Sequence, residues 1–195
     1  MLGSQSKEYV VRLALDQERH RQLHGEPREV DVMRWDKYVR QASPEILRLA
    51  AALRDIRDQE EWSSFNEIEN LLTFAQTMEY HSDRAPDGKS MDWPKYPLET
   101  LWDNGGDCED SAILAASLLL SLGYDVALLF LPEHAALGIA GAGGLPGTFL
   151  QVGGQRYYYY ETTATGWEFG ELPERYQGAN FRVLPIQTEG LASFS

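Results

Sequence analysis

The most reactive group that this sequence offers is a single cysteine. Cys108 is the only cysteine among 195 residues, which excludes an internal disulfide and any zinc site built from several thiolates. It follows Asn-Gly-Gly-Asp at residues 104–107, a turn and N-cap pattern, so we expect Cys108 in the first turn of a helix. The positive end of the helix dipole favours a thiolate there, whereas Asp107, Glu109 and Asp110 oppose it. A lone cysteine on an apolar helix is more often an inert core residue, but its position at the helix start favours a nucleophile.

A thiol nucleophile needs a base, and His134 is the best candidate among the four histidines. The other three lie in polar segments, whereas His134 begins an expected strand within apolar sequence. A buried imidazole requires a hydrogen-bonding partner. A structural histidine with such a partner is the alternative, and the presence of Cys108 favours the base.

Glu161 is the candidate for the residue that orients His134. It ends a run of four tyrosines, and a carboxylate in such apolar surroundings also needs a partner. If the strands flanking residues 141–154 pair with Ala140 opposite Gln155, His134 faces Glu161. Directly opposed side chains have Cβ atoms roughly 4.5 to 5.5 Å apart, within reach of a hydrogen bond. The sequence therefore predicts a Cys-His-Glu triad.

The hydrophobic periodicity and the capping, glycine and proline residues predict the helices and strands that must position these residues. Two amphipathic helices are expected, over residues 43–59 and from Ser63 or Ser64 to just before Tyr80, followed by a surface loop over 81–97. The helix from Cys108 to Leu122 is apolar nearly all round, so it belongs at the centre of the domain, and Gly123 ends it. The remaining expectations are an edge strand at 8–15, a helix or turn at 16–24, strands at 124–131, 134–140, 155–162 and 181–186, and a glycine-rich flap at 141–154.

These elements predict an α+β fold in which a buried helix carrying the cysteine packs on an antiparallel sheet, with additional N-terminal helices. The length suits a single domain over residues 1–195. Within it we expect a strand and helix extension at 1–42 and a catalytic core at 43–188.

The net charge and the hydropathy pattern exclude some classes of binding partner. A net charge of −13 and a pI near 4.7 argue against nucleic acid, whose binding requires clustered Lys and Arg. No apolar run approaches eighteen residues, and residues 1–6 are not followed by the apolar segment of a signal peptide, so we expect a soluble chain that does not insert into membranes. The first four residues are also compatible with a vector-derived start, which leaves an upstream signal or anchor open.

Several segments carry a family resemblance. Residues 106–110 (Gly-Asp-Cys-Glu-Asp), His134-Ala135 and residues 160–163 (Tyr-Glu-Thr-Thr) resemble the Cys, His and acid-x-Thr segments of the transglutaminase-like superfamily. Upstream, Phe74-Ala75-Gln76 with Tyr80, and residues 96–101 (Tyr-Pro-Leu-Glu-Thr-Leu), look like the lead-in of its prokaryotic members. The resemblance covers roughly Pro44 to Pro185, with the motifs in order, and departs from many members in having Glu161 where they have Asp.

The resemblance implies a papain-like fold and an acyl-enzyme on Cys108. By analogy with papain-like enzymes, the Gln76 amide is the candidate for a second oxyanion donor beside the Cys108 backbone N–H, with a solvent-facing helix glutamine as the alternative. No cofactor is required. The bacterial cysteine proteinases that this segment resembles include calcium-dependent ones, so Asp107, Glu109 and Asp110 are candidate calcium ligands, with helix capping as the plainer interpretation.

Three functions fit these features. The leading one is a cysteine peptidase or amidase acting on a protein or peptide substrate, and a transglutaminase with an amine acceptor is the closest alternative. The third is a non-catalytic peptide-binding module on the same fold. The presence of all three candidate triad residues argues against that module, because it has no need to keep them.

Overall fold

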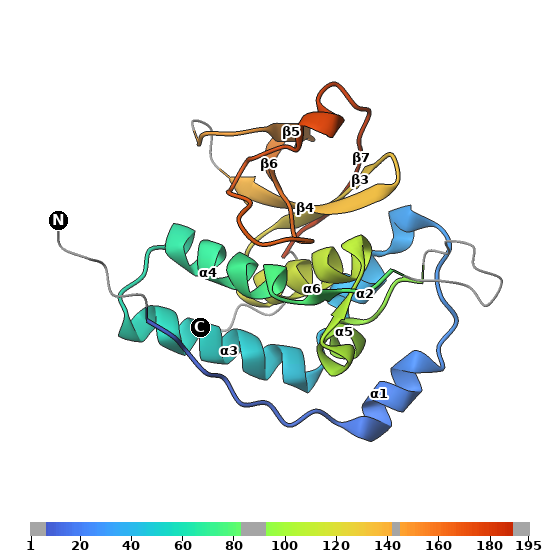
Figure 1. Ribbon diagram of the computed structural model, residues 1–195, viewed down its shortest axis with the longest axis vertical. Helices are drawn as coiled ribbons and strands as arrows, with labels where there is room; N and C mark the ends of the chain where they lie inside the picture. Colours follow the sequence, from blue (N-terminus) through green and yellow to red (C-terminus); the bar gives the residue numbers. More distant parts are fainter. Residues whose placement is uncertain (1–6, 83–92, 142–144, 189–195) are drawn as a thin grey trace.

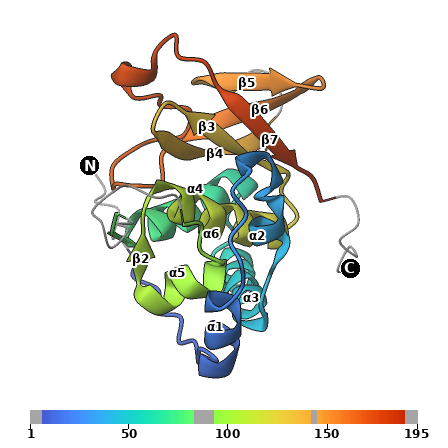
Figure 2. The same ribbon diagram turned by 90° about the vertical axis from the view of Figure 1, so that its right-hand side faces the viewer.

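The computed structural model describes residues 7–82, 93–141 and 145–188. It has two layers, with a group of helices on one side and a curled antiparallel sheet on the other (Figure 1). The sheet lies at one end of the molecule and α1 at the other, as the second view confirms (Figure 2). The helices are α1 (Gln17–His24), α2 (Asp36–Arg40), α3 (Pro44–Gln59), α4 (Ser64–Gln76), α5 (Pro97–Asp103) and α6 (Cys108–Ser121), with short 3₁₀ turns η1 (Val32–Arg34) and η2 (Glu174–Tyr176).

The helix that carries Cys108, α6, lies at the centre of the core, as its sequence predicts. Its residues from Glu109 to Leu120 are all buried, and it contacts α2, α3, α4, α5, β3 and β4. Its C-terminal end is followed by Gly123 at φ +93°, a backbone conformation that glycine adopts without strain. Trp35, Tyr38 and Val39, which precede α3, are part of the same core.

Five strands form the main sheet in the order β5-β6-β4-β3-β7, all antiparallel. They are β3 (Val126–Leu131), β4 (His134–Gly141), β5 (Phe149–Val152), β6 (Gln155–Tyr160) and β7 (Arg182–Ile186). Successive side chains point to opposite faces. Leu128, Leu137 and Tyr160 therefore face the helices, whereas Leu129 and Tyr159 join a second apolar cluster on the outer face. The predicted α+β class, with a buried cysteine helix on an antiparallel sheet, is confirmed.

The predicted register of the β4–β6 pair is wrong by two residues. Ala140 lies opposite Tyr157, not Gln155. Gln155 instead pairs with Val152 across a tight hairpin, whose turn is Gly153-Gly154 with φ +58° and +84°. The segment expected to be a flap therefore contains strand β5. A shift of two residues leaves every side chain on its predicted face, because the side-chain period of a strand is two.

One other expectation needs correction. Residues 8–15 form no strand, although Val11, Leu13 and Leu15 alternate inward and pack against the core. The alternation is satisfied by packing on helices, so no sheet partner is needed. The expected loop at 81–97 ends where Pro97 begins α5, and its residues 83–92 lie outside the described ranges.

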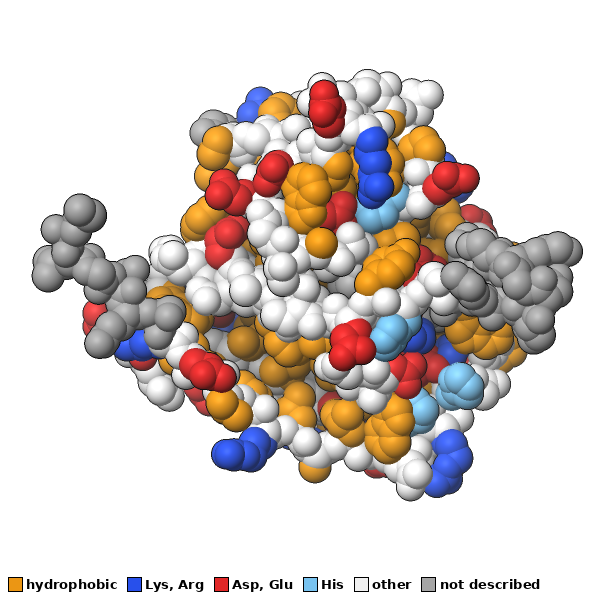
Figure 3. Space-filling model, in the orientation of Figure 1, with side chains coloured by type: hydrophobic (Ala, Val, Ile, Leu, Met, Phe, Trp, Pro, Cys, Tyr) orange, Lys and Arg blue, Asp and Glu red, His pale blue; other side chains and the backbone are white. Residues whose placement is uncertain are grey.

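The N-terminal segment borders an apolar groove of about 670 Å³ between residues 8–15, α3 and α4. Hydrophobic side chains gather in a hollow on the lower half of the corresponding face (Figure 3). Among the described helices, none is long and apolar enough to cross a membrane.

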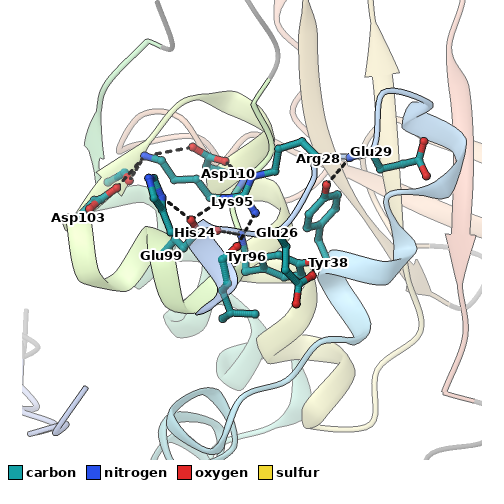
Figure 4. Close-up of polar contacts among 12 residues, drawn as sticks. His24, Glu26, Arg28, Glu29, Tyr38, Lys95, Tyr96, Glu99, Asp103 and Asp110 are labelled. Carbon is teal, nitrogen blue, oxygen red and sulfur yellow. Dashed lines mark hydrogen bonds and ion pairs between the residues drawn. The ribbon is translucent and has the colours of Figure 1, made fainter. Parts of the chain in front are cut away.

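A polar network fixes the beginning of α6 (Figure 4). The Lys95 ammonium lies 3.2 Å from Asp103 and 3.5 Å from Asp110. In the same network the buried Glu99 accepts hydrogen bonds from Arg28 at 2.6 Å and from His24 at 3.0 Å. The first turn of α6 is thereby connected to α5 and α1.

The two glycines before Asp107 leave room for close backbone approach. Gly105 in β2 (Gly105–Gly106) pairs parallel with Glu79 in β1 (Glu79–Tyr80). A Cβ at Gly105 would lie 2.1 Å from the Glu79 carbonyl oxygen, and one at Gly106 would lie 2.2 Å from an Asp110 carboxylate oxygen. The Gly-Gly pair therefore allows α6 to begin directly beside β1.

Gly105→Ala should lower the free energy of unfolding by about 1 to 3 kcal/mol, because backbone cannot yield to the added methyl group. Denaturant unfolding measures the change. Gly25→Ala is the matched control, since its Cβ would meet nothing closer than 3.5 Å and it should be nearly neutral. Equal stability of the two variants would contradict this account of the β1–β2 contact.

Candidate active site

Cys108 begins α6 and is in contact with the start of β4. The Ala135 N–H donates to the Cys108 Sγ at 3.4 Å, and the thiol donates to the Glu109 Oε2 at 3.3 Å. Since Ala135 directly follows His134, this contact brings the candidate base to the end of α6 that carries Cys108. Cys108 and His134 line one cavity together.

The electrostatic surroundings of the thiol differ from the expectation based on helix position. Burial and, after it, the Glu109 carboxylate raise the pKa of Cys108, although the Ala135 N–H acts in the opposite direction. Burial and the nearby Asp107 carboxylate also hold the pKa of Glu109 well above its ordinary value. The Cys108 side chain is therefore a neutral thiol at neutral pH.

His134 and Glu161 form a nearly dry hydrogen bond. The His134 Nε2 lies 2.9 Å from the Glu161 Oε2, and the two side chains are 6% and 2% exposed. The last ladder pair is Leu137 with Tyr160, so Glu161 lies just beyond the end of β6 and diagonal to His134. The long glutamate side chain spans this diagonal. With Nε2 bonded to the carboxylate, Nδ1 is the ring nitrogen left for the thiol.

Every oxygen of the Glu161 carboxylate is hydrogen-bonded. Oε1 accepts from the backbone N–H groups of Thr162 and Thr163, both at 3.1 Å, and from the Thr163 hydroxyl at 2.7 Å. Oε2 accepts from His134 and from the Tyr159 hydroxyl at 2.8 Å. Burial alone would raise the pKa of Glu161, but these donors, His134 first, bring it down to about 2. Glu161 is thus a permanent anion at neutral pH.

Two tyrosines at this site were not foreseen from the sequence. Tyr159 had a signal, because a residue two positions before Glu161 shares its face of the strand. Tyr176 had none, since it comes from the short 3₁₀ turn η2. Its ring is stacked on the His134 imidazole with centroids 5.3 Å apart and planes 9° apart.

Two cavities border the His134 side chain. The larger, about 700 Å³, includes Cys108, Asp107 and Glu109 on one side and apolar residues Trp35 and Phe130 on the other. The smaller, about 480 Å³, is more polar and includes Arg175 and Tyr176. Both are lined by Tyr80, Pro132, Glu133 and His134.

Gln76 does not have the position expected of an oxyanion donor. Its Nε2 donates to the carbonyl oxygens of Glu161 at 2.9 Å and Trp167 at 3.2 Å. The side chain is buried, and it is not among the described residues that line either cavity. Gln76 instead fixes the backbone of the segment that begins with Glu161.

Two of the three candidate calcium ligands are suitably arranged. One ligand atom from each of Asp107, Cys108 and Glu109 lies within 4.8 Å of the others. Asp107 Oδ1 and Glu109 Oε1 are buried without a hydrogen-bond partner in the described structure, which is the environment that a cation would satisfy.

Asp110 does not belong to this group, contrary to expectation. Its Oδ1 accepts from the Lys95 N–H at 2.8 Å, and its Oδ2 accepts from the Asp107 N–H at 3.3 Å. The latter contact is one half of a capping box at the start of α6, and the Lys95 ammonium is adjacent. Asp110 therefore has a structural role.

Comparisons with known proteins give a limited likeness. No protein-family model matches the chain, and no curated protein matches it. Among solved structures, LapG of Legionella pneumophila is similar, with 20% identity and a TM-score of 0.44 over 66% of this chain and 78% of that one. The calcium-bound form of LapG has 18% identity and a TM-score of 0.44, covering 81% of this chain and 85% of that one.

Glu161→Gln should destabilise the protein at neutral pH, because an amide leaves at least one of the five donors facing an NH₂ group. The folded-state pKa is about 2, below the ordinary value of 4.5, so the stabilisation is full above the ordinary value and is lost as pH falls toward 2. The loss in the free energy of unfolding at pH 7 should be on the order of 3 kcal/mol. Urea unfolding measures it.

The difference between Glu161→Gln and wild type should shrink steadily as the pH of the unfolding experiment is lowered. Glu174→Gln changes an exposed carboxylate and should track the wild type at every pH. A deficit of Glu161→Gln that stays constant down to acid pH would show that the charge of Glu161 does not stabilise the fold.

Proposed function

We propose that this chain is a cysteine-dependent acyl-transfer enzyme, a peptidase or amidase, with Cys108 as nucleophile, His134 as base and Glu161 as the residue that orients the base. Its main support is the fully satisfied Glu161 carboxylate bonded to His134, beside a thiol that contacts the next residue of the same strand. The ordered motifs that resemble the transglutaminase-like superfamily agree with this assignment.

Acylation begins with a neutral thiol. As the Cys108 Sγ attacks the substrate carbonyl carbon, the thiol proton passes to the His134 Nδ1, so the thiolate never needs to exist alone. The Glu161 anion stabilises the imidazolium that forms. His134 then gives its proton to the leaving amine as the C–N bond breaks, which leaves a thioester on Cys108.

The tetrahedral intermediate carries a negative oxygen that needs donors. The Cys108 backbone N–H, in the first turn of α6, has no acceptor within the helix and is the first donor. The second donor, expected from the sequence to be Gln76, is the Tyr80 hydroxyl, since Tyr80 lines both cavities. His134 next removes a proton from water, which attacks the thioester and releases the acid while the thiol is regenerated.

A calcium ion fits beside this site. Asp107 and Glu109 would hold it, given their close carboxylates and buried oxygens without partners. Bound there, the ion would offset the negative charge next to Cys108.

Profiling a peptide library for hydrolysis and for amine incorporation tests the reaction. Cys108→Ala should abolish turnover, and His134→Ala should lower it about 100- to 10,000-fold, the usual contribution of a general base. Glu161→Ala should also cause a large loss. His20→Ala and Glu18→Ala are matched controls in α1, at the end of the molecule away from the sheet, and should keep full activity.

Full turnover in Cys108→Ala would overturn the assignment of a cysteine-dependent enzyme. Glu161→Ala with wild-type turnover, beside an inactive His134→Ala, would move the orienting role to another residue. Product carrying the added amine in place of the free acid would identify a transglutaminase.

Calcium should raise the melting temperature, because a ligand that binds only the native state stabilises it. Calorimetry with calcium and with a chelator measures the shift. Asp107→Asn and Glu109→Gln should remove the response to calcium. Asp110→Asn should lower the melting temperature but keep the response to calcium. A response that survives both ligand variants would place calcium elsewhere.

A further inference from the structure

We propose that Tyr176 is a positioning residue that holds the His134 imidazole in the plane required for proton transfer with Cys108. The inference rests on the proposed function of His134. Its basis is the parallel stack of the two rings, 5.3 Å between centroids and 9° between planes.

A hydrogen bond to one ring nitrogen fixes a point and leaves the ring free to tilt. The Glu161 carboxylate holds the His134 Nε2 at 2.9 Å, so Glu161 determines where the far edge of the ring lies. The flat face of Tyr176 restricts the remaining tilt. Together the two contacts direct Nδ1, which has to receive the thiol proton.

Tyr176 is itself rigidly held, although it comes from the three-residue turn η2. Its N–H donates to the Pro173 carbonyl at 2.9 Å, and its carbonyl accepts from the Ala179 N–H at 3.1 Å. The ring is 7% exposed and belongs to the apolar cluster on the outer face of the sheet, which also contains Tyr159. Since Tyr159 donates to Glu161, one cluster supports both partners of the imidazole.

The stack also suits the charge that His134 carries after it takes the proton. An aromatic face attracts a cation, and the attraction is larger away from water. The Arg175 guanidinium lies 4.6 Å from the same ring centroid, so the ring already contacts one cation. The other charged or titratable groups that line the cavities around His134 are Glu133, Tyr80, Cys108, Asp107, Glu109 and Arg182.

The test compares Tyr176→Phe, which keeps the ring, with Tyr176→Leu, which keeps apolar volume but has no aromatic face. Tyr157→Leu is the matched control for lost packing, since Tyr157 is buried in the same cluster but pairs with Ala140 and Leu150. Tyr176→Leu should lower kcat about 2- to 30-fold with KM little changed. Tyr176→Phe and Tyr157→Leu, once shown to be folded, should stay near wild type.

A second readout does not depend on activity. In ¹⁵N-histidine spectra of the full chain, wild-type His134 should show one tautomer with its proton on Nε2, and Tyr176→Leu should show exchange between ring states, while Tyr176→Phe and Tyr157→Leu keep the wild-type pattern. Unchanged kcat and an unchanged His134 spectrum in Tyr176→Leu would overturn the proposal, as would equal effects of Tyr176→Leu and Tyr157→Leu. If wild type has no Cys108-dependent turnover, the proposed function fails and the His134 spectra alone decide the role of Tyr176.

Discussion

The buried carboxylate of Glu161 is the constraint on which the candidate site depends. A buried anion is costly unless it is paired and fully hydrogen-bonded, and Glu161 has five donors. They come from the start of β4, the end of β6 and the turn beyond it, so the ends of these two strands must stay aligned. Gln76 adds to this by holding the Glu161 carbonyl from α4. The carboxylate therefore orients His134 and also organises the edge of the sheet.

A second set of contacts brings Cys108 to that edge. Gly105 and Gly106 allow α6 to begin against β1, and Asp110 secures its first turn through Asp107 and Lys95. The buried helix then carries Cys108 to the start of β4, where the Ala135 N–H meets the sulfur. The candidate active site thus lies at the junction of the helical and sheet layers.

The sequence predicted the parts of this structure that depend on side-chain periodicity. The all-round apolar pattern of α6 located the core, and a hydrogen bond between His134 and Glu161 was expected. The prediction of this hydrogen bond used the wrong strand register. The glycine-rich segment gave no sign that it contains strand β5 and the Gly153-Gly154 turn, which set the observed register. The error was harmless to the pairing because a shift of two residues preserves the face of each side chain.

The directions in which polar side chains point were predicted less accurately. A motif gives the residue type of Gln76 or Asp110 but not where its polar atoms point, and both are bonded within the protein. Tyr176 reaches His134 from a distant turn, which no local pattern announces. Such contacts depend on tertiary packing, and they become visible only with the folded chain.

The surroundings of two glutamates near Cys108 shift their pKa values in opposite directions. Glu161, surrounded by donors, has a pKa of about 2, whereas burial beside Asp107 holds the pKa of Glu109 well above normal. Environments that separate the pKa values of like groups are typical of acid–base sites. At neutral pH the anion is thus retained next to the imidazole, where it stabilises a positive charge, and Glu109 keeps its proton next to the sulfur. The same protonation limits the repulsion that a developing Cys108 thiolate would meet, so the acidic residues around Cys108 are compatible with the nucleophilic role that we propose for it.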